Sequence, residues 1–143
     1  MSNWQKFGWL TKHQATSEEI RALLAVADRD LHDSDVAGLS ADTQLGLVYN
    51  AALQLATAAL AAEGYRAARD SKHLRTIESL ALTIQLDGAD VRRFDAFRRK
   101  RNISDYERAG ATSELEAAEM KTFARDLQNS VAAWLKSNHS ELL

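Results

Sequence analysis

The sequence from Ala41 to Glu63 reads ADTQLGLVYNAALQLATAALAAE, and this stretch decides the fold. Plotted as a helix at about 100° per residue, its apolar residues cover one side and much of a second. The first side carries Leu45, Val48, Ala52, Leu55, Ala59 and Ala62, and the second carries Tyr49, Leu53 and Leu60. Only Asn50, Gln54 and Thr57 form a polar strip. This pattern predicts a central helix that neighbours cover on more than one side.

The rest of the chain also favours helices. Its 143 residues contain no Pro, where average usage would give about seven. Further helices are predicted from a capping box at Thr16 to about Leu31, from about Ser71 to Asp87, from Ala89 to Arg101, and from a second capping box at Ser113 to about Lys136. The sequence therefore predicts an all-α fold, an antiparallel four- to five-helix bundle, as a single domain over residues 1–143.

Residues 1–15 form an aromatic lead-in segment with Trp4, Phe7, Trp9 and Leu10. The two Trp in these residues are expected to dock on the bundle or on a second subunit. Membrane contact is the alternative, but the segment lacks the sustained basic amphipathic face that would favour it. Together with the wide apolar surface of residues 41–63, this segment leads us to expect a homodimer.

Composition excludes several kinds of chemistry. No Cys is present, so disulfides, thiolate metal sites and cysteine catalysis are excluded. The four His are scattered and none has a metal-ligand spacing, so no metal or other cofactor is expected. The stretch His32-Asp33-Ser34-Asp35 holds residue types that bind metals, but it is interpreted as a polar loop. Polar residues interrupt the apolar runs, so no membrane contact is expected, and without a secretory pattern a cytoplasmic location is the default.

The most basic stretch runs from Arg92 to Arg101. It holds six basic residues, Arg92, Arg93, Arg98, Arg99, Lys100 and Arg101, against one acid, Asp95, so its local charge is +5 in a chain whose net charge is −2. Such a run is commonly a solvated helix face, and binding of nucleic acid by Arg92, Arg93, Arg98, Arg99 and Lys100 is the functional alternative.

Arg101 differs from its neighbours because the helical wheel places it on the apolar side with Phe94 and Phe97, whereas Arg92 and Arg99 point outward. A guanidinium on that side needs an acid, a ligand or a water-filled cleft. A structural ion pair and a phosphate site both remain open.

Tyr106 follows Arg101 by five residues, which places the two about 140° apart on a continuous helix. They can share a cleft only if the helix ends between them. We expect this end at Asn102, because Asn tolerates the left-handed backbone that terminates helices and Ser104-Asp105 favours a turn.

The motif Arg101-Asn102-x-x-x-Tyr106, late in a helical chain, resembles that of the HEPN superfamily, R-x(4–6)-H with a polar residue after the Arg. Arg101 and Asn102 match, while Tyr106 stands where the family has His. The resemblance implies a helical domain, a metal-independent endoribonuclease or toxin of a toxin-antitoxin-type system, and a dimer with a shared cleft. It further implies an RNA or nucleotide ligand and, as in many members, a nucleotidyltransferase partner.

His73 is predicted on the apolar side of its helix, near an N-terminus that lowers its pKa. A structural role and a role as the missing imidazole both remain open. Three function classes follow: a ribonuclease with catalytic residues Arg101, Asn102, Tyr106 and His73, a non-catalytic RNA- or nucleotide-binding module, and a helical interaction protein in which Arg101 is only an ion pair.

Overall fold

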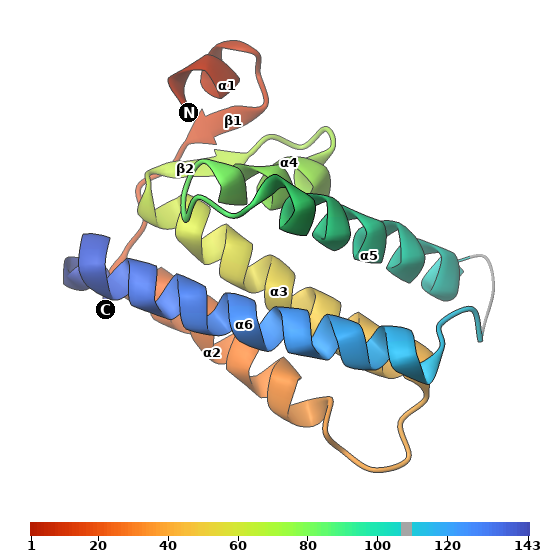
Figure 1. Cartoon of the computed structure of the whole chain (residues 1–143). Coiled ribbons are helices and arrows are strands. Elements are labelled where there is room, and N and C mark those ends of the chain that lie inside the picture. Colours follow the sequence, from red (N-terminus) through yellow and green to blue (C-terminus); the bar gives the residue numbers. More distant parts are fainter. Residues whose placement is uncertain (107–109) are drawn as a thin grey trace.

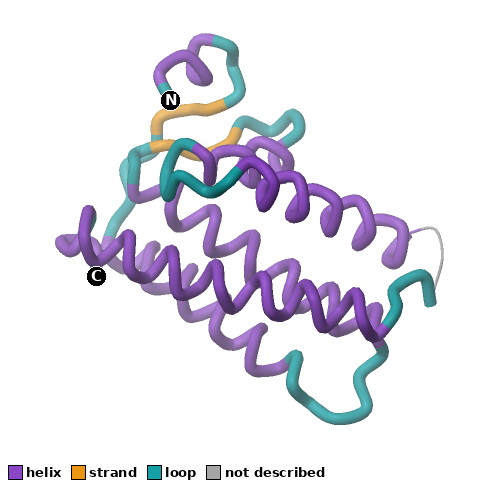
Figure 2. The backbone as a smooth tube through the Cα atoms, viewed as in Figure 1, coloured by secondary structure: helices purple, strands orange, loops and turns teal. Residues whose placement is uncertain are grey.

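The computed structural model describes residues 1–106 and 110–143, with side chains described for residues 1–102 and 110–143 (Figure 1). Most of the described chain is helical, which confirms the helical class (Figure 2). The α-helices are α1 (Ser2–Lys6), α2 (Ser17–Asp33), α3 (Ala41–Ala62), α4 (Lys72–Glu78), α5 (Gly88–Tyr106) and α6 (Glu114–Asn138). Two short strands, β1 (Leu10–Lys12) and β2 (Tyr65–Ala67), and two 3₁₀ turns, η1 (Ser79–Ala81) and η2 (Ser140–Leu142), complete the described elements.

Helix α3 occupies the centre. It contacts α2, α6, α5 and α4, and Figure 1 shows the long helices lying along it. Buried side chains on α3 include Leu45 and Leu55 on one side and Tyr49 and Leu53 on the other. Its many Ala residues let neighbouring backbones approach closely. The prediction of a central helix is confirmed, and both of its apolar sides are buried within the chain itself.

Helix α3 also corrects the expectation that polar residues interrupt every long apolar run. By length and composition alone, its 22 residues are enough and apolar enough to cross a membrane. However, 67% of its most apolar part is buried inside the protein. A helix that other helices enclose can have the same length and composition as a membrane-spanning one. The apolar character of α3 is therefore explained by its central position.

The two predicted capping boxes differ. At α6 the box is complete: the Ser113 hydroxyl accepts from the backbone N–H of Glu116, whose side chain accepts from the backbone N–H of Ser113. At α2 the Thr16 hydroxyl accepts from the backbone N–H of Glu19. The Glu19 carboxylate instead lies 2.8 Å from Nε2 of His13. Both helix starts lie where the sequence predicts them.

The third predicted helix is shorter than expected. Instead of continuing to Asp87, α4 ends at Glu78 and passes into η1, after which Gln85 adopts a left-handed backbone with φ of 61°. Hydroxyls at Ser79 and Thr83 donate to the carbonyls of Thr76 and Ser79, respectively. Such local bonds compete with a regular helix, so apolar periodicity alone overestimates its length.

The lead-in segment docks through a ribbon that the sequence did not predict. Strand β1 pairs antiparallel with β2, with Leu10 opposite Ala67 and Thr11 opposite Arg66. Leu10 is buried against Leu60 of α3. Docking of the two Trp on the rest of the chain is confirmed: Trp4 packs against the cluster of Leu10 and Leu60, and the guanidinium of Arg75 on α4 lies 3.5 Å from the centre of the Trp9 ring. Phe7 remains 63% exposed.

Helix α5 continues through Asn102 to Tyr106, so the predicted break at residues 102–105 is wrong. No Gly or Pro occurs between Ala89 and Tyr106. Asn, Ser and Asp only mildly disfavour a helix interior, so they do not stop one by themselves. The side chain of Tyr106 lies outside the described residues.

Candidate functional site

Arg101 points inward from α5, as the helical wheel predicts. Its side chain is half-buried, and its Cζ lies 5.5 Å from the centre of the Tyr49 ring on α3. A guanidinium over an aromatic face is attracted by the negative potential of the ring. Arg92 and Arg99 are exposed, also as predicted. The distinction between Arg101 and its basic neighbours is therefore present in the structure.

Tyr49 is the residue that sequence analysis missed. Only 1% of it is exposed, and its ring packs edge-on against Phe94 at 5.9 Å. Among the described residues its hydroxyl has no hydrogen-bond partner. Burial raises the pKa of Tyr49 to about 12, against the opposing charges of Arg101 and Arg98. The phenol therefore stays protonated, and its hydroxyl is a buried donor.

His73 lies on the other side of this contact. It is the second residue of α4, and its ring centre is 6.5 Å from that of Tyr49. The residue is exposed as a whole, although its ring lies on the side of α4 that faces Tyr49. Partial burial of the imidazole, followed by the positive charges of Arg101, Lys72 and Arg98, lowers the pKa of His73. The predicted lowering of the pKa of His73 is correct, but it is caused by burial and these positive charges and not by the helix N-terminus.

Three elements thus meet at the Tyr49 ring: α3 supplies the ring, α4 supplies His73 and α5 supplies Arg101. We call these three residues the Tyr49 site. The charge of Arg101 reaches His73, so the two sequence candidates lie within electrostatic range. Asn102 follows on α5 and is half-buried. Because α5 is continuous, the backbone positions of Arg101 and Tyr106 are about 140° apart around it.

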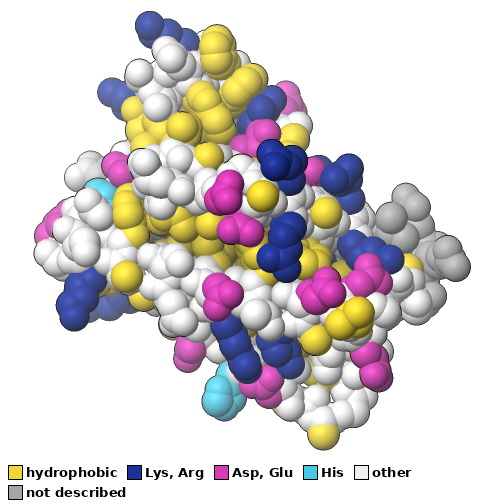
Figure 3. All heavy atoms as spheres, in the orientation of Figure 1, with side chains coloured by type: hydrophobic (Ala, Val, Ile, Leu, Met, Phe, Trp, Pro, Cys, Tyr) yellow, Lys and Arg dark blue, Asp and Glu magenta, His cyan; other side chains and the backbone are white. Residues whose placement is uncertain are grey.

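The other basic residues of α5 are largely paired with acids. Arg98 Nε donates to Asp95 Oδ1 at 2.7 Å, and Arg99 Nε lies 3.5 Å from the other Asp95 oxygen. Lys100 Nζ lies 3.3 Å from Glu116 of α6, and Arg93 lies 3.8 Å from Asp90. In Figure 3, basic and acidic side chains are interspersed over α5 and α6. The predicted basic patch is therefore partly neutralised.

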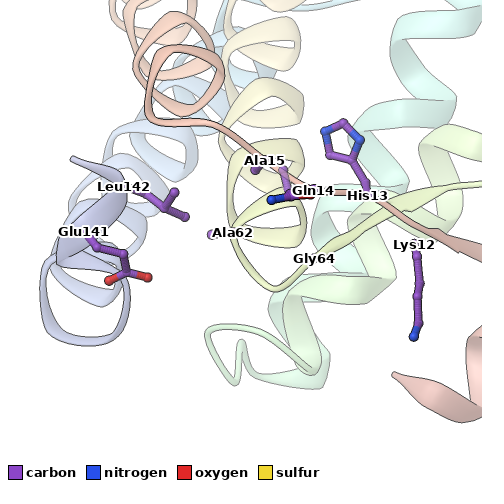
Figure 4. A pocket seen from close by; sticks show the side chains of 9 residues that line it. Lys12, His13, Gln14, Ala15, Ala62, Gly64, Glu141 and Leu142 are labelled. Carbon is purple, nitrogen blue, oxygen red and sulfur yellow. The ribbon is translucent and has the colours of Figure 1, made fainter.

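A hollow of about 490 Å³ lies elsewhere, between the β1–α2 link, the end of α3 and η2. Figure 4 shows Lys12 and Glu141 at opposite ends of it. His13, on its edge, is bonded to Glu19. These charged groups do not converge on one point, so this hollow is a weaker candidate than the Tyr49 site. Across the described residues, no three His, Asp or Glu side chains are grouped to hold a metal ion.

The chain matches no protein-family model, curated protein or solved structure in the three comparisons made.

Proposed function

We propose that this chain binds RNA or a nucleotide through a phosphate at the Tyr49 site. One observation carries the proposal: Arg101 and His73, from different helices, lie beside the same buried ring. The planar guanidinium of Arg101 suits phosphate oxygens. His73 lies in positive potential from Arg101, Lys72 and Arg98, which an anion would relieve. The Tyr49 hydroxyl is a donor without a partner among the described residues.

The same residues could cleave RNA without a metal. An imidazole with a lowered pKa is neutral near pH 7, so His73 can accept the proton of a ribose 2′-hydroxyl. The 2′-oxygen then forms a bond to phosphorus, the bond from phosphorus to the 5′-oxygen breaks, and water protonates that oxygen. Arg101 would stabilise the charge that develops on the phosphate oxygens, with Asn102 orienting the group. Tyr49 is too weak an acid to form a base at this pH.

The HEPN resemblance extends the proposal. It favours a four- to five-helix bundle, a toxin role in the cytoplasm, a nucleotidyltransferase partner and a homodimer. Since both sides of α3 are buried within the chain, that helix no longer supports the dimer, which now depends on the aromatic lead-in. Because α5 is continuous, the backbone of Tyr106 lies about 140° around the helix from Arg101, so the cleft expected between them is not formed. The role of the motif His is therefore proposed for His73.

A helical interaction protein is the second candidate function. Phe7 is 63% exposed and lies 5.0 Å from the ring of Trp9, which itself lies 5.5 Å from that of Trp4. Aromatic side chains grouped at a surface are typical of protein contacts. In this alternative, Phe7→Ala would abolish association with the partner, while Arg101→Ala would leave it unchanged.

The test is incubation of the purified protein with labelled single-stranded RNA in EDTA, with binding and cleavage measured in parallel. Arg101→Ala should abolish cleavage and weaken binding. Arg99→Ala removes the same charge from the outer face two residues away and serves as the matched control, with only a modest loss of binding. If wild-type protein neither binds nor cleaves RNA or nucleotides, the proposal fails. If Arg99→Ala equals Arg101→Ala, binding is a general charge effect and the Tyr49 site is not its cause.

A further inference from the structure

A basic hollow lies on the outer side of the ribbon formed by β1 and β2. It measures about 360 Å³ and is lined by Thr11, Arg66, Ala67, Ala68, Arg69 and Lys72. Thr11 and Arg66 are cross-strand partners, so their side chains share one face of the ribbon, opposite the face that buries Leu10. We call it the ribbon hollow.

The cations of the ribbon hollow are not neutralised as those of α5 are. Arg66, Arg69 and Lys72 are exposed, and within the described part of the chain their side chains form no hydrogen bond or ion pair. Asp70 is the only acid between Arg66 and Lys72. A concave surface with uncompensated charge of one sign concentrates counter-ions, so this hollow attracts anions more strongly than its charge count alone suggests.

The ribbon hollow adjoins the Tyr49 site. Lys72 lines the hollow, and the next residue is His73, on which the charge of Lys72 acts. At its other side, the backbone N–H of Ala68 donates to the carbonyl of Trp9 at 2.8 Å, and Trp9 contacts the exposed ring of Phe7. The hollow is therefore connected to His73 through Lys72, and to Phe7 through Ala68 and Trp9. Proteins that bind single-stranded nucleic acid combine such cations with aromatic rings on which bases stack.

We propose that the ribbon hollow is a second phosphate subsite, which holds the backbone of single-stranded RNA extending from the Tyr49 site, with Phe7 as a stacking surface for a base. This inference rests on the proposed function and specifies its ligand as a single strand several nucleotides long.

The experiment measures binding of fluorescent 12-nucleotide single-stranded RNA by anisotropy over a series of salt concentrations. The double variant Arg66→Ala/Arg69→Ala removes two cations from the hollow, and Arg21→Ala/Lys136→Ala removes two exposed cations from α2 and α6 as the control. Each lost contact should lower the slope of log K against log salt by about 0.7, so the hollow variant should lose about 1.4. Phe7→Ala should weaken binding roughly 5- to 150-fold at an unchanged slope.

The outcomes separate the two proposals. An unchanged slope in the hollow variant, with Arg101→Ala still weakening binding, overturns the subsite and leaves the proposed function standing. A lowered slope in the hollow variant with no effect of Arg101→Ala supports the hollow as a binding surface and overturns the Tyr49 site. Equal affinity for a 12-base-pair duplex overturns the single-strand assignment. Binding to phosphatidylserine vesicles without binding to RNA overturns it in favour of a lipid headgroup.

Discussion

Replacing Tyr49 with Phe removes one hydroxyl and keeps the ring against which Arg101 and His73 lie. The residue is 1% exposed and its hydroxyl has no partner among the described residues. A buried polar group without a hydrogen bond costs about 1–3 kcal/mol. Tyr49→Phe should therefore increase the free energy of unfolding by about 1 kcal/mol or more, which raises Tm by roughly 3 °C or more. If the hydroxyl donates to a bound phosphate, the same variant should bind RNA more weakly.

The pH dependence of this effect follows from the pKa of about 12 for Tyr49. The ordinary pKa is about 10, so between these values the folded state keeps a proton that the unfolded state has lost. Stability of the wild type must then fall as pH rises through this range. The full difference of two pKa units corresponds to about 3 kcal/mol. Tyr49→Phe lacks this proton, so its advantage over wild type should grow from pH 9.5 to pH 12.

Thermal and urea unfolding followed by circular dichroism measure both effects. Tyr65→Phe is the control, because Tyr65 on β2 is only half-buried and should change stability by less than about 0.5 kcal/mol. A loss of stability in Tyr49→Phe at pH 7.5 would show that the hydroxyl has a stabilising partner. If the stability advantage of Tyr49→Phe over the wild type does not grow with pH, the raised pKa assigned to the buried Tyr49 hydroxyl is refuted.

Two further outcomes are expected. His73→Gln should make the free energy of unfolding less sensitive to acid, because the pKa of His73 in the folded state lies below its ordinary 6.5 and the wild type therefore loses stability as pH falls through 6.5. Thermal unfolding at pH 7.5 and pH 5 compares the two proteins. Equal losses of stability in both would contradict the environment assigned to His73. Light scattering at tens of micromolar should give twice 15.9 kDa for the wild type, whereas a mass of 15.9 kDa removes the dimer.

Periodicity and capping residues predict the long helices well because both are local properties. The predicted helix from Ala41 to Glu63 differs from α3 by one residue, and the capping hydroxyls of Thr16 and Ser113 lie at the starts of α2 and α6. The ribbon could not be predicted in this way. Its strands have three residues each and pair Leu10 with Ala67, far along the chain, so no local pattern records the contact.

The candidate site was predictable in part for the same reason. The wheel gives the direction of Arg101 because direction depends on the local helix alone. The contact between Arg101 and Tyr49 depends on how α5 packs on α3, and the periodicity of the sequence does not determine this packing. Tyr49 was interpreted as one more apolar position, although a Tyr as the single aromatic residue in α3 could have indicated a need for its hydroxyl. The stop expected at Asn102 failed because a preference of less than about 1 kcal/mol cannot end a helix.

The contrast between the two basic surfaces shows why charge counts along a sequence mislead. Residues 92–101 carry more positive charge, yet acids one helical turn away and on α6 lie within 4 Å of four of those side chains. The stretch from Arg66 to Lys72 carries less, but none of its three cations forms an ion pair within the described residues. A binding surface requires positive charge that the protein's own acids leave uncompensated. On that criterion, ligand binding is expected at the ribbon hollow and the adjoining Tyr49 site rather than along the outer face of α5.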